Sequence, residues 1–142
     1  FNCRLGDPET QVILPRLKTD LLQVMMCTAE GSLEKLTINW DPIACVGVVL
    51  ASRGYPDKYL TGYQISGLDQ LTEQVEVFHA GTKMDETKKG TSSRSILTGG
   101  GRVLTVSASG ESLKEARRKV YQEIEHIHFE GSFYRSDIAD IF

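Results

Sequence analysis

The residues with the clearest chemical potential lie at the start of the chain, around a Gly-Asp-Pro turn. On an extended segment, residues two apart face the same side, so Asn2 and Arg4 are expected to point together. An Asn carbonyl can bind Mg²⁺ beside phosphate and carboxylate oxygens, and a guanidinium binds phosphate through paired hydrogen bonds. Asp7 and Glu9 follow on a turn that leads into a helix. Such a group suits metal-assisted phosphoryl transfer, but the spacing alone favours an ordinary polar turn with a surface ion pair.

A second candidate anion site lies at residues 99–102, where consecutive glycines precede Arg102. Successive glycines let backbone N–H groups approach an anion closely, and the guanidinium adds a fork of donors. The alternative is a tight hairpin turn between two strands, which glycine pairs also favour. The bare sequence leaves both interpretations open.

The histidines provide weaker signals. His79 stands at the end of a predicted strand, where it could hydrogen-bond a substrate or act near neutral pH, although a structural role is the more common one. His126 and His128 lack an evident third ligand, so a metal site is not expected there.

The helices are predicted from periodicity and capping signals. A short helix is expected over residues 9–14, and Pro15 either starts a new helix or kinks this one. Apolar residues recur at helical spacing from Leu17 to Ala29, with Met25 and Met26 in the core and Gly31 as the C-terminal cap. The last helix begins with a capping box at Ser112 and presents one apolar stripe. That stripe comprises Leu113, Ala116, Val120, Ile124 and Ile127.

The strands are predicted from apolar runs bounded by glycine and proline. A buried strand is expected over residues 43–51, and residues 1–4 would end an earlier one. Shorter strands are expected at 62–65, 75–79, 95–98 and 102–107. The polar stretch 85–95 is interpreted as a mobile hairpin loop. These elements predict an α+β fold of compact antiparallel strands with a packed helix.

Composition limits the class of protein. Of the 142 residues, 40% are hydrophobic and 25% charged, enough for a packed core. The net charge of −3 argues against a nucleic-acid binder, which needs a basic surface. No apolar run has the length of a membrane-spanning helix. The three cysteines are widely spaced, which predicts reduced, mostly buried thiols in a cytoplasmic protein. The chain does not begin with Met, and we interpret Phe1 as a cut inside a longer polypeptide.

Several motifs together resemble the phosphoribosylamine–glycine ligases, which are ATP-grasp enzymes. The stretch Asn2-Cys-Arg-Leu-Gly-Asp-Pro-Glu-Thr-Gln11 is similar to the last active-site segment of that family. The similarity continues in order along nearly the whole chain, at 51–56, 78–82, 98–104 and 129–138. The chain departs from the family in a longer loop between Thr82 and Thr98, and in Ala139, where glycine is expected.

This resemblance implies a fold, a reaction and a set of ligands. Residues 1–35 would end the ATP-grasp domain, and residues 36–142 would form a small antiparallel, hybrid-barrel-like β domain with a packed helix. The enzyme would join glycine to 5-phosphoribosylamine with ATP, through a glycyl phosphate, and release ADP and phosphate. It would be a monomer, with neither nucleic-acid nor membrane partners.

The resemblance also implies roles for individual residues. Asn2 would hold Mg²⁺ or Mn²⁺ together with a Glu two residues upstream, which lies outside this chain. Arg4 would be catalytic. Asp7, Glu9 and Arg102 would bind the substrates.

Two other interpretations stay open from the residues. Lys83 lies between Thr82 and Met84 and faintly resembles the modified lysine on the hairpin tip of a biotinyl or lipoyl carrier. Alternatively, the chain is a structural domain that covers a catalytic domain. A carrier would have a Met before this lysine, which is missing here, whereas the structural interpretation is compatible with the ligase one.

Overall fold

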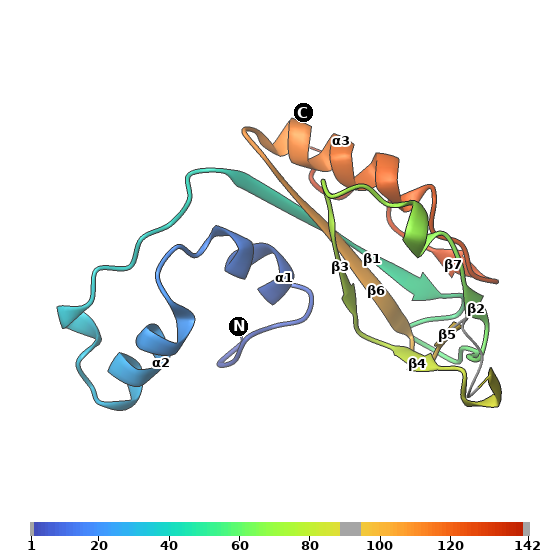
Figure 1. Cartoon of the computed structure of the whole chain (residues 1–142), viewed down its shortest axis with the longest axis horizontal. Helices are drawn as coiled ribbons and strands as arrows, with labels where there is room; N and C mark the ends of the chain where they lie inside the picture. Colours follow the sequence, from blue (N-terminus) through green and yellow to red (C-terminus); the bar gives the residue numbers. More distant parts are fainter. Residues whose placement is uncertain (1, 89–94, 141–142) are drawn as a thin grey trace.

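The computed structural model describes residues 2–88 and 95–140, and it is built around a four-stranded antiparallel sheet of order β3-β6-β1-β7 (Figure 1). A smaller three-stranded sheet has the order β2-β5-β4. The strands are β1 (Ala44–Ser52), β2 (Gln64–Ile65), β3 (Glu76–His79), β4 (Thr82–Met84), β5 (Ile96–Thr98), β6 (Arg102–Gly110) and β7 (Ser132–Phe133). The helices are α1 (Thr10–Ile13), α2 (Leu21–Ala29) and α3 (Leu113–Ile124), with 3-10 turns at Leu14–Arg16, Leu33–Lys35, Leu68–Gln70 and Glu86–Lys88. The predicted α+β class with antiparallel sheets is confirmed.

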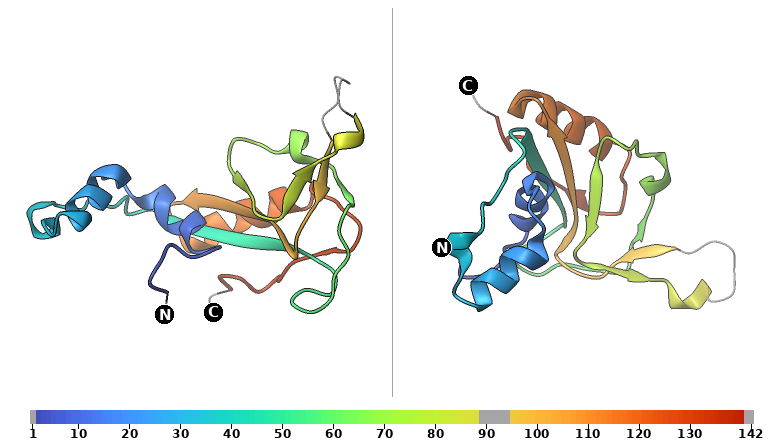
Figure 2. Two further views of the ribbon diagram at one scale, coloured as in Figure 1. Left: turned by 90° about the horizontal axis from the view of Figure 1, so that it is seen from below. Right: turned by 60° about the vertical axis from the view of Figure 1, so that its left-hand side comes forward.

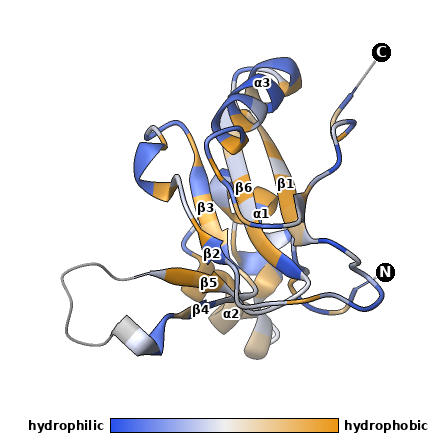
Figure 3. Cartoon of the chain, turned by 90° about the vertical axis from the view of Figure 1, so that its right-hand side faces the viewer, coloured by the Kyte–Doolittle hydropathy of each residue, from blue (hydrophilic) through white to orange (hydrophobic). Residues whose placement is uncertain are grey.

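The long pair β1 and β6 forms the centre of the molecule. Its register places Val46, Val48 and Leu50 on the face shared with Val106 and Leu104, and all five are buried. Figure 3 shows the hydrophobic colouring of these strands beside α3, in which hydrophilic residues predominate. The apolar run that predicted this strand therefore reflects a face covered by a helix.

Helix α3 covers that face because its apolar stripe matches it. The side chain of Ser112 accepts a hydrogen bond from the Glu115 amide, as the capping box predicted. Ala116, Val120 and Ile124 are then fully or almost fully buried. Leu113 was predicted on the same stripe but is 41% exposed, because it stands in the first turn at the edge of the contact.

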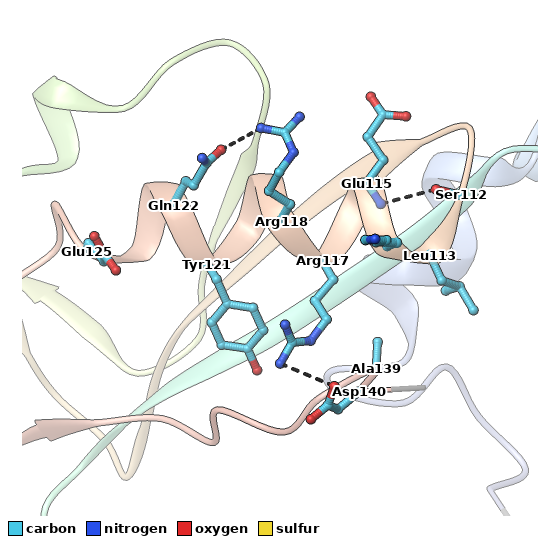
Figure 4. A pocket seen from close by; sticks show the side chains of 11 residues that line it. Ser112, Leu113, Glu115, Arg117, Arg118, Tyr121, Gln122, Glu125, Ala139 and Asp140 are labelled. Atoms are coloured by element: carbon cyan, nitrogen blue, oxygen red, sulfur yellow. Dashed lines mark hydrogen bonds and ion pairs between the residues drawn. The ribbon is translucent and has the colours of Figure 1, made fainter. Parts of the chain in front are cut away.

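The C-terminal segment folds back against α3. Arg117 donates from Nε to the Ile138 carbonyl at 3.0 Å and from Nη2 to the Ser136 carbonyl at 2.7 Å, and its guanidinium lies over the Tyr121 ring. Figure 4 shows Arg117 and Tyr121 turned toward the C-terminal segment that carries Asp140. Charged residues of a helix off its apolar stripe usually form a solvated face. Arg117 and Lys119 depart from this, since both are half-buried and bonded to backbone carbonyls.

The turn between β5 and β6 transfers the chain from one sheet to the other. The strand β5 pairs with β2 and β4, whereas β6 pairs with β1 and β3. The hairpin predicted as the alternative role of residues 99–102 is therefore wrong, since the strands on either side do not pair. A turn between sheets requires a sharper change of direction than a hairpin, and glycines allow it.

The N-terminal part extends away from the sheets. Helix α1 contacts the face of β1 opposite α3, where a Cβ at Gly47 would lie only 2.7 Å from Val12 Cγ1. Helix α2 lies beyond it, well separated from the sheet in Figures 1 and 2. Met25 and Met26 are 57% and 54% exposed. Their predicted place in the core is wrong, because nothing in the described chain packs on that side of α2.

Other predictions differ in detail. Asn2 to Arg4 do not form the end of a strand, since no described strand lies beside them to share hydrogen bonds. The short strands β4 and β7 were not predicted. Of the predicted loop 85–95, residues 89–94 lie outside the described part. Cys3 is exposed, whereas Cys27 and Cys45 are half-buried. Every helix in the described ranges is too short or too polar to cross a membrane.

Candidate functional site

Segments far apart in the sequence meet where β1 ends and β6 begins. Ser52 donates from its amide to the Gly101 carbonyl at 2.8 Å and from its hydroxyl to the Gly100 carbonyl at 2.9 Å. The Arg53 amide donates to the Gly131 carbonyl at 2.8 Å. The register between β1 and β6 shifts between Leu50 and Ala51, just before this meeting point. Such irregularities redirect a strand and are common beside functional sites.

The glycine turn packs against backbone and aromatic rings. The Gly99 amide donates to the Gly81 carbonyl at 2.7 Å. A Cβ at Gly81 would lie 2.4 Å from the Arg102 carbonyl oxygen, and one at Gly101 would lie 2.3 Å from the Tyr55 ring. Close approach of other groups therefore explains at least two of these glycines. The Gly99 N–H group is already used within the protein.

Arg102 connects this turn to the N-terminal loop. Its Nη1 donates a short hydrogen bond to the Asp7 carbonyl, and its Nη2 lies 3.6 Å from Asp7 Oδ2. Asp7 Oδ1 accepts a hydrogen bond from Gln11 Nε2 at 2.8 Å. Both charged side chains are 40% exposed. The structure thus brings together Asp7 and Arg102, which the sequence proposed as parts of separate sites.

The N-terminal loop also brings Asn2 and Glu9 together. A Cβ added at Gly6 would lie 2.2 Å from Glu9 Oε2 and 3.3 Å from Asn2 Nδ2. Both side chains therefore fold over the same glycine, and any side chain at position 6 would displace them. The Thr10 amide holds the loop by donating to the Gly6 carbonyl at 3.0 Å. Arg4 is exposed and, among the described residues, donates only to the neighbouring Leu5 carbonyl, at 3.1 Å.

This donor set suits a divalent cation only as part of a larger site. Asn2 is exposed, and within the described residues its side-chain oxygen accepts no hydrogen bond. Glu9 adds a nearby carboxylate. Hard cations prefer such oxygens, but they need more of them than this pair offers. Across the described ranges, no group of three His, Cys, Asp or Glu residues is placed to hold a metal.

His79 and Lys83 lie on β3 and β4, which follow each other in the sequence but belong to different sheets. His79 Nδ1 is 3.0 Å from Thr82 Oγ1, which gives the ring a structural partner at the exposed end of β3. Lys83 lies in the middle of β4 and pairs with Leu97. A carrier lysine must stand at a hairpin tip, so this position does not support the carrier interpretation.

The family follows from a match to most of the chain. Residues 45–141 match the family model described as phosphoribosylglycinamide synthetase, C domain. The chain belongs to this family. In this chain, the matched residues include the two sheets, α3 and the glycine turn, whereas the Asn2–Glu9 loop precedes them.

Curated relatives extend the similarity to the N-terminal loop. A phosphoribosylamine–glycine ligase of Caldanaerobacter subterraneus is 49% identical over 139 residues, which is 98% of this chain and 31% of the relative. That of Halalkalibacterium halodurans is also 49% identical over 139 residues, covering 98% of the chain and 30% of the relative. The chain thus spans about a third of the length of these relatives.

A solved structure agrees with the fold. The crystal structure of a phosphoribosylamine–glycine ligase from Thermotoga maritima superposes with a TM-score of 0.78 at 37% identity. The superposition covers 96% of this chain and 32% of that one. The similarity therefore includes the arrangement of the synthetase C-domain sheets and of the segment that precedes them.

Some residues of the site had not been identified from the sequence. Ser52, Tyr55 and Gln11 each bond to or pack against a predicted residue. Ser52 and Tyr55 lie in the 51–56 motif, and Gln11 ends the first motif. The order of these motifs signalled their importance, but only the register of β1 and β6 shows that they meet.

Proposed function

We propose that this chain is the C-terminal part of an ATP-dependent ligase that joins glycine to 5-phosphoribosylamine. The parent polypeptide, meaning a ligase of the relatives' length that contains this chain, would carry the remaining nucleotide-binding segments. The observation that carries the proposal is the similarity of 98% of the chain to proteins named for this reaction. The bond from Arg102 to Asp7 supports it, since it joins the loop that would face ATP to the family's C domain.

The proposed reaction has two chemical steps. A glycine carboxylate oxygen attacks the γ-phosphorus of ATP, the bond to the β–γ bridging oxygen breaks, and ADP leaves. The amine of phosphoribosylamine then attacks the carbonyl carbon of glycyl phosphate, the C–O bond to phosphate breaks, and the amine loses a proton. The product is glycinamide ribonucleotide. Positioning and charge stabilisation dominate such transfers.

The N-terminal loop would serve the first step. Asn2, with Glu9 beside it and the predicted Glu upstream, would hold Mg²⁺ or Mn²⁺. The metal supplies charge neutralisation on the phosphate oxygens when it is bound. Arg4 is exposed, and its bond within the described residues goes to its neighbour's carbonyl, so its guanidinium can turn to the transferring phosphoryl group. We place the protein in the cytoplasm as a monomer, without nucleic-acid or membrane partners.

The test uses substitutions in the parent polypeptide. Asn2→Ala should lower kcat and raise the Mg²⁺ concentration needed for half-maximal rate, because one metal ligand is lost. Arg4→Lys should lower kcat roughly tenfold or more, since a point charge does not replace a bidentate fork. Steady-state kinetics against Mg²⁺ measure both.

Lys18→Gln is the matched control, since Lys18 pairs with Asp41 away from the loop. If both test variants keep the wild-type kcat/KM at limiting Mg²⁺, then Asn2 does not bind the metal and Arg4 does not bind the phosphoryl group. An unchanged control shows that the loss of a polar contact away from the loop does not by itself lower turnover.

A further inference from the structure

A pocket of about 640 Å³ lies beside the glycine turn and has no part in the roles described so far. Its size falls within the range of roughly 300–1,000 Å³ that is usual for small-molecule sites. Its walls come from the loop after β1 and from the segment before β7. The lining includes Arg53, Lys58, Tyr59, Tyr63 and Glu130.

The backbone holds this pocket in shape. Gly54 has a φ of 98°, and a Cβ there would lie 2.1 Å from the Lys58 carbonyl oxygen. The Asp57 amide closes the same loop by donating to the Gly54 carbonyl at 2.8 Å. On the opposite wall, the Arg53 backbone bonds to Gly131, whose added Cβ would lie 3.9 Å from Arg53 Nε. The two cations are thus placed by loops that tolerate little change.

Neither cation of the pocket has an acidic partner in the part of the chain that the structure describes. Within the described residues, no carboxylate lies within 4.0 Å of Arg53 or Lys58. Five other cations of the described residues are paired, although exposed ones such as Arg4 and Lys114 are not: Lys18 with Asp41, Arg102 with Asp7, Arg117 with Asp140, Lys119 with Glu115 and Arg135 with Asp137. With Glu130, the pocket carries a net charge of about +1. It is therefore suited to an anion that also offers hydroxyl groups to a carboxylate.

The pocket borders the site through one aromatic ring. A Cβ at Gly101 would lie 2.9 Å from Tyr59 Cε1, so Tyr59 separates the glycine turn from the pocket. Arg102, on the other side of this turn, already bonds to Asp7. A sugar phosphate needs cationic donors other than those that serve ATP. Arg53 and Lys58 are unpaired donors of this kind.

We propose that Arg53, Lys58 and Tyr59 form a binding site for the phosphate of a phosphorylated pentose. The two cations bind the phosphate oxygens, Tyr59 forms a wall for the sugar, and Glu130 accepts hydrogen bonds from its hydroxyl or amino groups. The identification of this phosphate as the 5-phosphate of phosphoribosylamine rests on the proposed function. The binding site itself can be tested without turnover.

The experiment measures binding of ribose 5-phosphate, ribose and inorganic phosphate to the chain by NMR titration, after circular dichroism has shown each variant to be folded. Ribose 5-phosphate should bind saturably, with shifts at Gly54 and Gly131. Arg53→Gln and Lys58→Gln should each weaken binding roughly tenfold to a hundredfold, as expected for the loss of a charge-assisted contact. Ribose should show no saturable binding, and inorganic phosphate should compete only weakly with ribose 5-phosphate.

Lys114→Gln is the matched control, because it removes one exposed positive charge on α3. The proposal is overturned if the wild-type chain shows no saturable binding, if both pocket variants bind as the wild type does, or if Lys114→Gln is equally weakened. It is also overturned if inorganic phosphate binds as tightly as ribose 5-phosphate, since the sugar wall would then contribute nothing.

A separate measurement on the parent polypeptide distinguishes this inference from the proposed function. Arg53→Gln should raise KM for phosphoribosylamine and leave KM for ATP unchanged. If the parent polypeptide forms no glycinamide ribonucleotide, the proposed function fails, while binding of ribose 5-phosphate that depends on Arg53 and Lys58 still establishes the pocket.

Discussion

Arg102 has two candidate roles that predict different results. As a ligand for a sugar phosphate, it would affect KM for phosphoribosylamine. As a link to Asp7, 95 positions away, it would position the N-terminal loop and affect stability and the ATP step. The contacts favour the second role, although the first stays a prediction.

We therefore expect Arg102→Ala to lower the free energy of unfolding by about 1.5 kcal/mol, the usual contribution of a charge-assisted hydrogen bond. Asp7→Asn should cost less, because the backbone carbonyl still accepts from Arg102, the side-chain oxygen can still accept from Gln11, and a partly exposed ion pair contributes only about 0.2–1 kcal/mol. Chemical denaturation measures both. Unchanged stability in Arg102→Ala, with a raised KM for phosphoribosylamine alone, would instead support the phosphate-binding role.

Ala139 has a backbone conformation that normally favours glycine, with a φ of 53°. The family resemblance predicted glycine at this position. A left-handed conformation destabilises the folded state by roughly 1–2 kcal/mol when the residue has a Cβ. Glycine has the opposite disadvantage, since the greater entropy of the unfolded chain lowers the free energy of unfolding by about 0.4–1 kcal/mol.

Ala139→Gly should therefore stabilise the chain by about 0.5–1 kcal/mol, although the half-buried methyl group offsets part of this gain. Denaturant unfolding provides the measurement. The control, Ala116→Gly in the buried face of α3, should destabilise by about 1 kcal/mol or more. A loss of stability in both variants would contradict the account of Ala139.

At the scale of elements, Glu123 joins α3 to the loop before β3. Its carboxylate accepts hydrogen bonds from the Thr72 amide and hydroxyl, both at 2.8 Å. The bond from the Thr72 amide is the main cause that holds the pKa of Glu123 below its ordinary value. Because the pKa is lower in the folded state, the ionised carboxylate stabilises the fold at any pH above the pKa of the unfolded state. This contribution is lost as the pH falls through the pKa of the folded state.

Glu123→Gln should therefore destabilise the chain at pH 7, and the difference from the wild type should shrink from roughly pH 5 downward as Glu123 of the wild type becomes protonated. Unfolding measured at several pH values tests this. Glu125→Gln is the control, because Glu125 is an exposed neighbour. A difference that is constant between pH 7 and pH 3 would show that the charge of Glu123 has no role.

The elements with strong local signals were predictable. The apolar run of β1 and the capping box of α3 depend on neighbours in the sequence. The strand lies within one residue of its predicted bounds, and the helix begins directly after the predicted cap but ends before Ile127. The partners of β5 and β6 were not predictable, because a turn between sheets and a hairpin turn use the same glycines. The site was predictable as a set of residues, but the bond between Asp7 and Arg102 depends on the fold of the whole chain.

At the scale of the whole molecule, the N-terminal part has few contacts of its own. Leu22, Met25 and Met26 leave an apolar surface on α2 that is more than half exposed, and such surfaces usually mark an interface. The relatives are about three times as long as this chain, which covers 31% of one of them. We expect the remaining segments of the parent polypeptide to cover this surface and to supply most groups that position ATP.

The most direct test is product formation from phosphoribosylamine, glycine and MgATP, followed by mass spectrometry of glycinamide ribonucleotide and by release of ADP. We predict that the parent polypeptide forms both products only when all three substrates are present. The 142-residue chain alone should form neither, because positioning carries most of phosphoryl-transfer catalysis. A parent polypeptide that forms no glycinamide ribonucleotide, or an isolated chain that forms it above a contaminant control, would contradict the account.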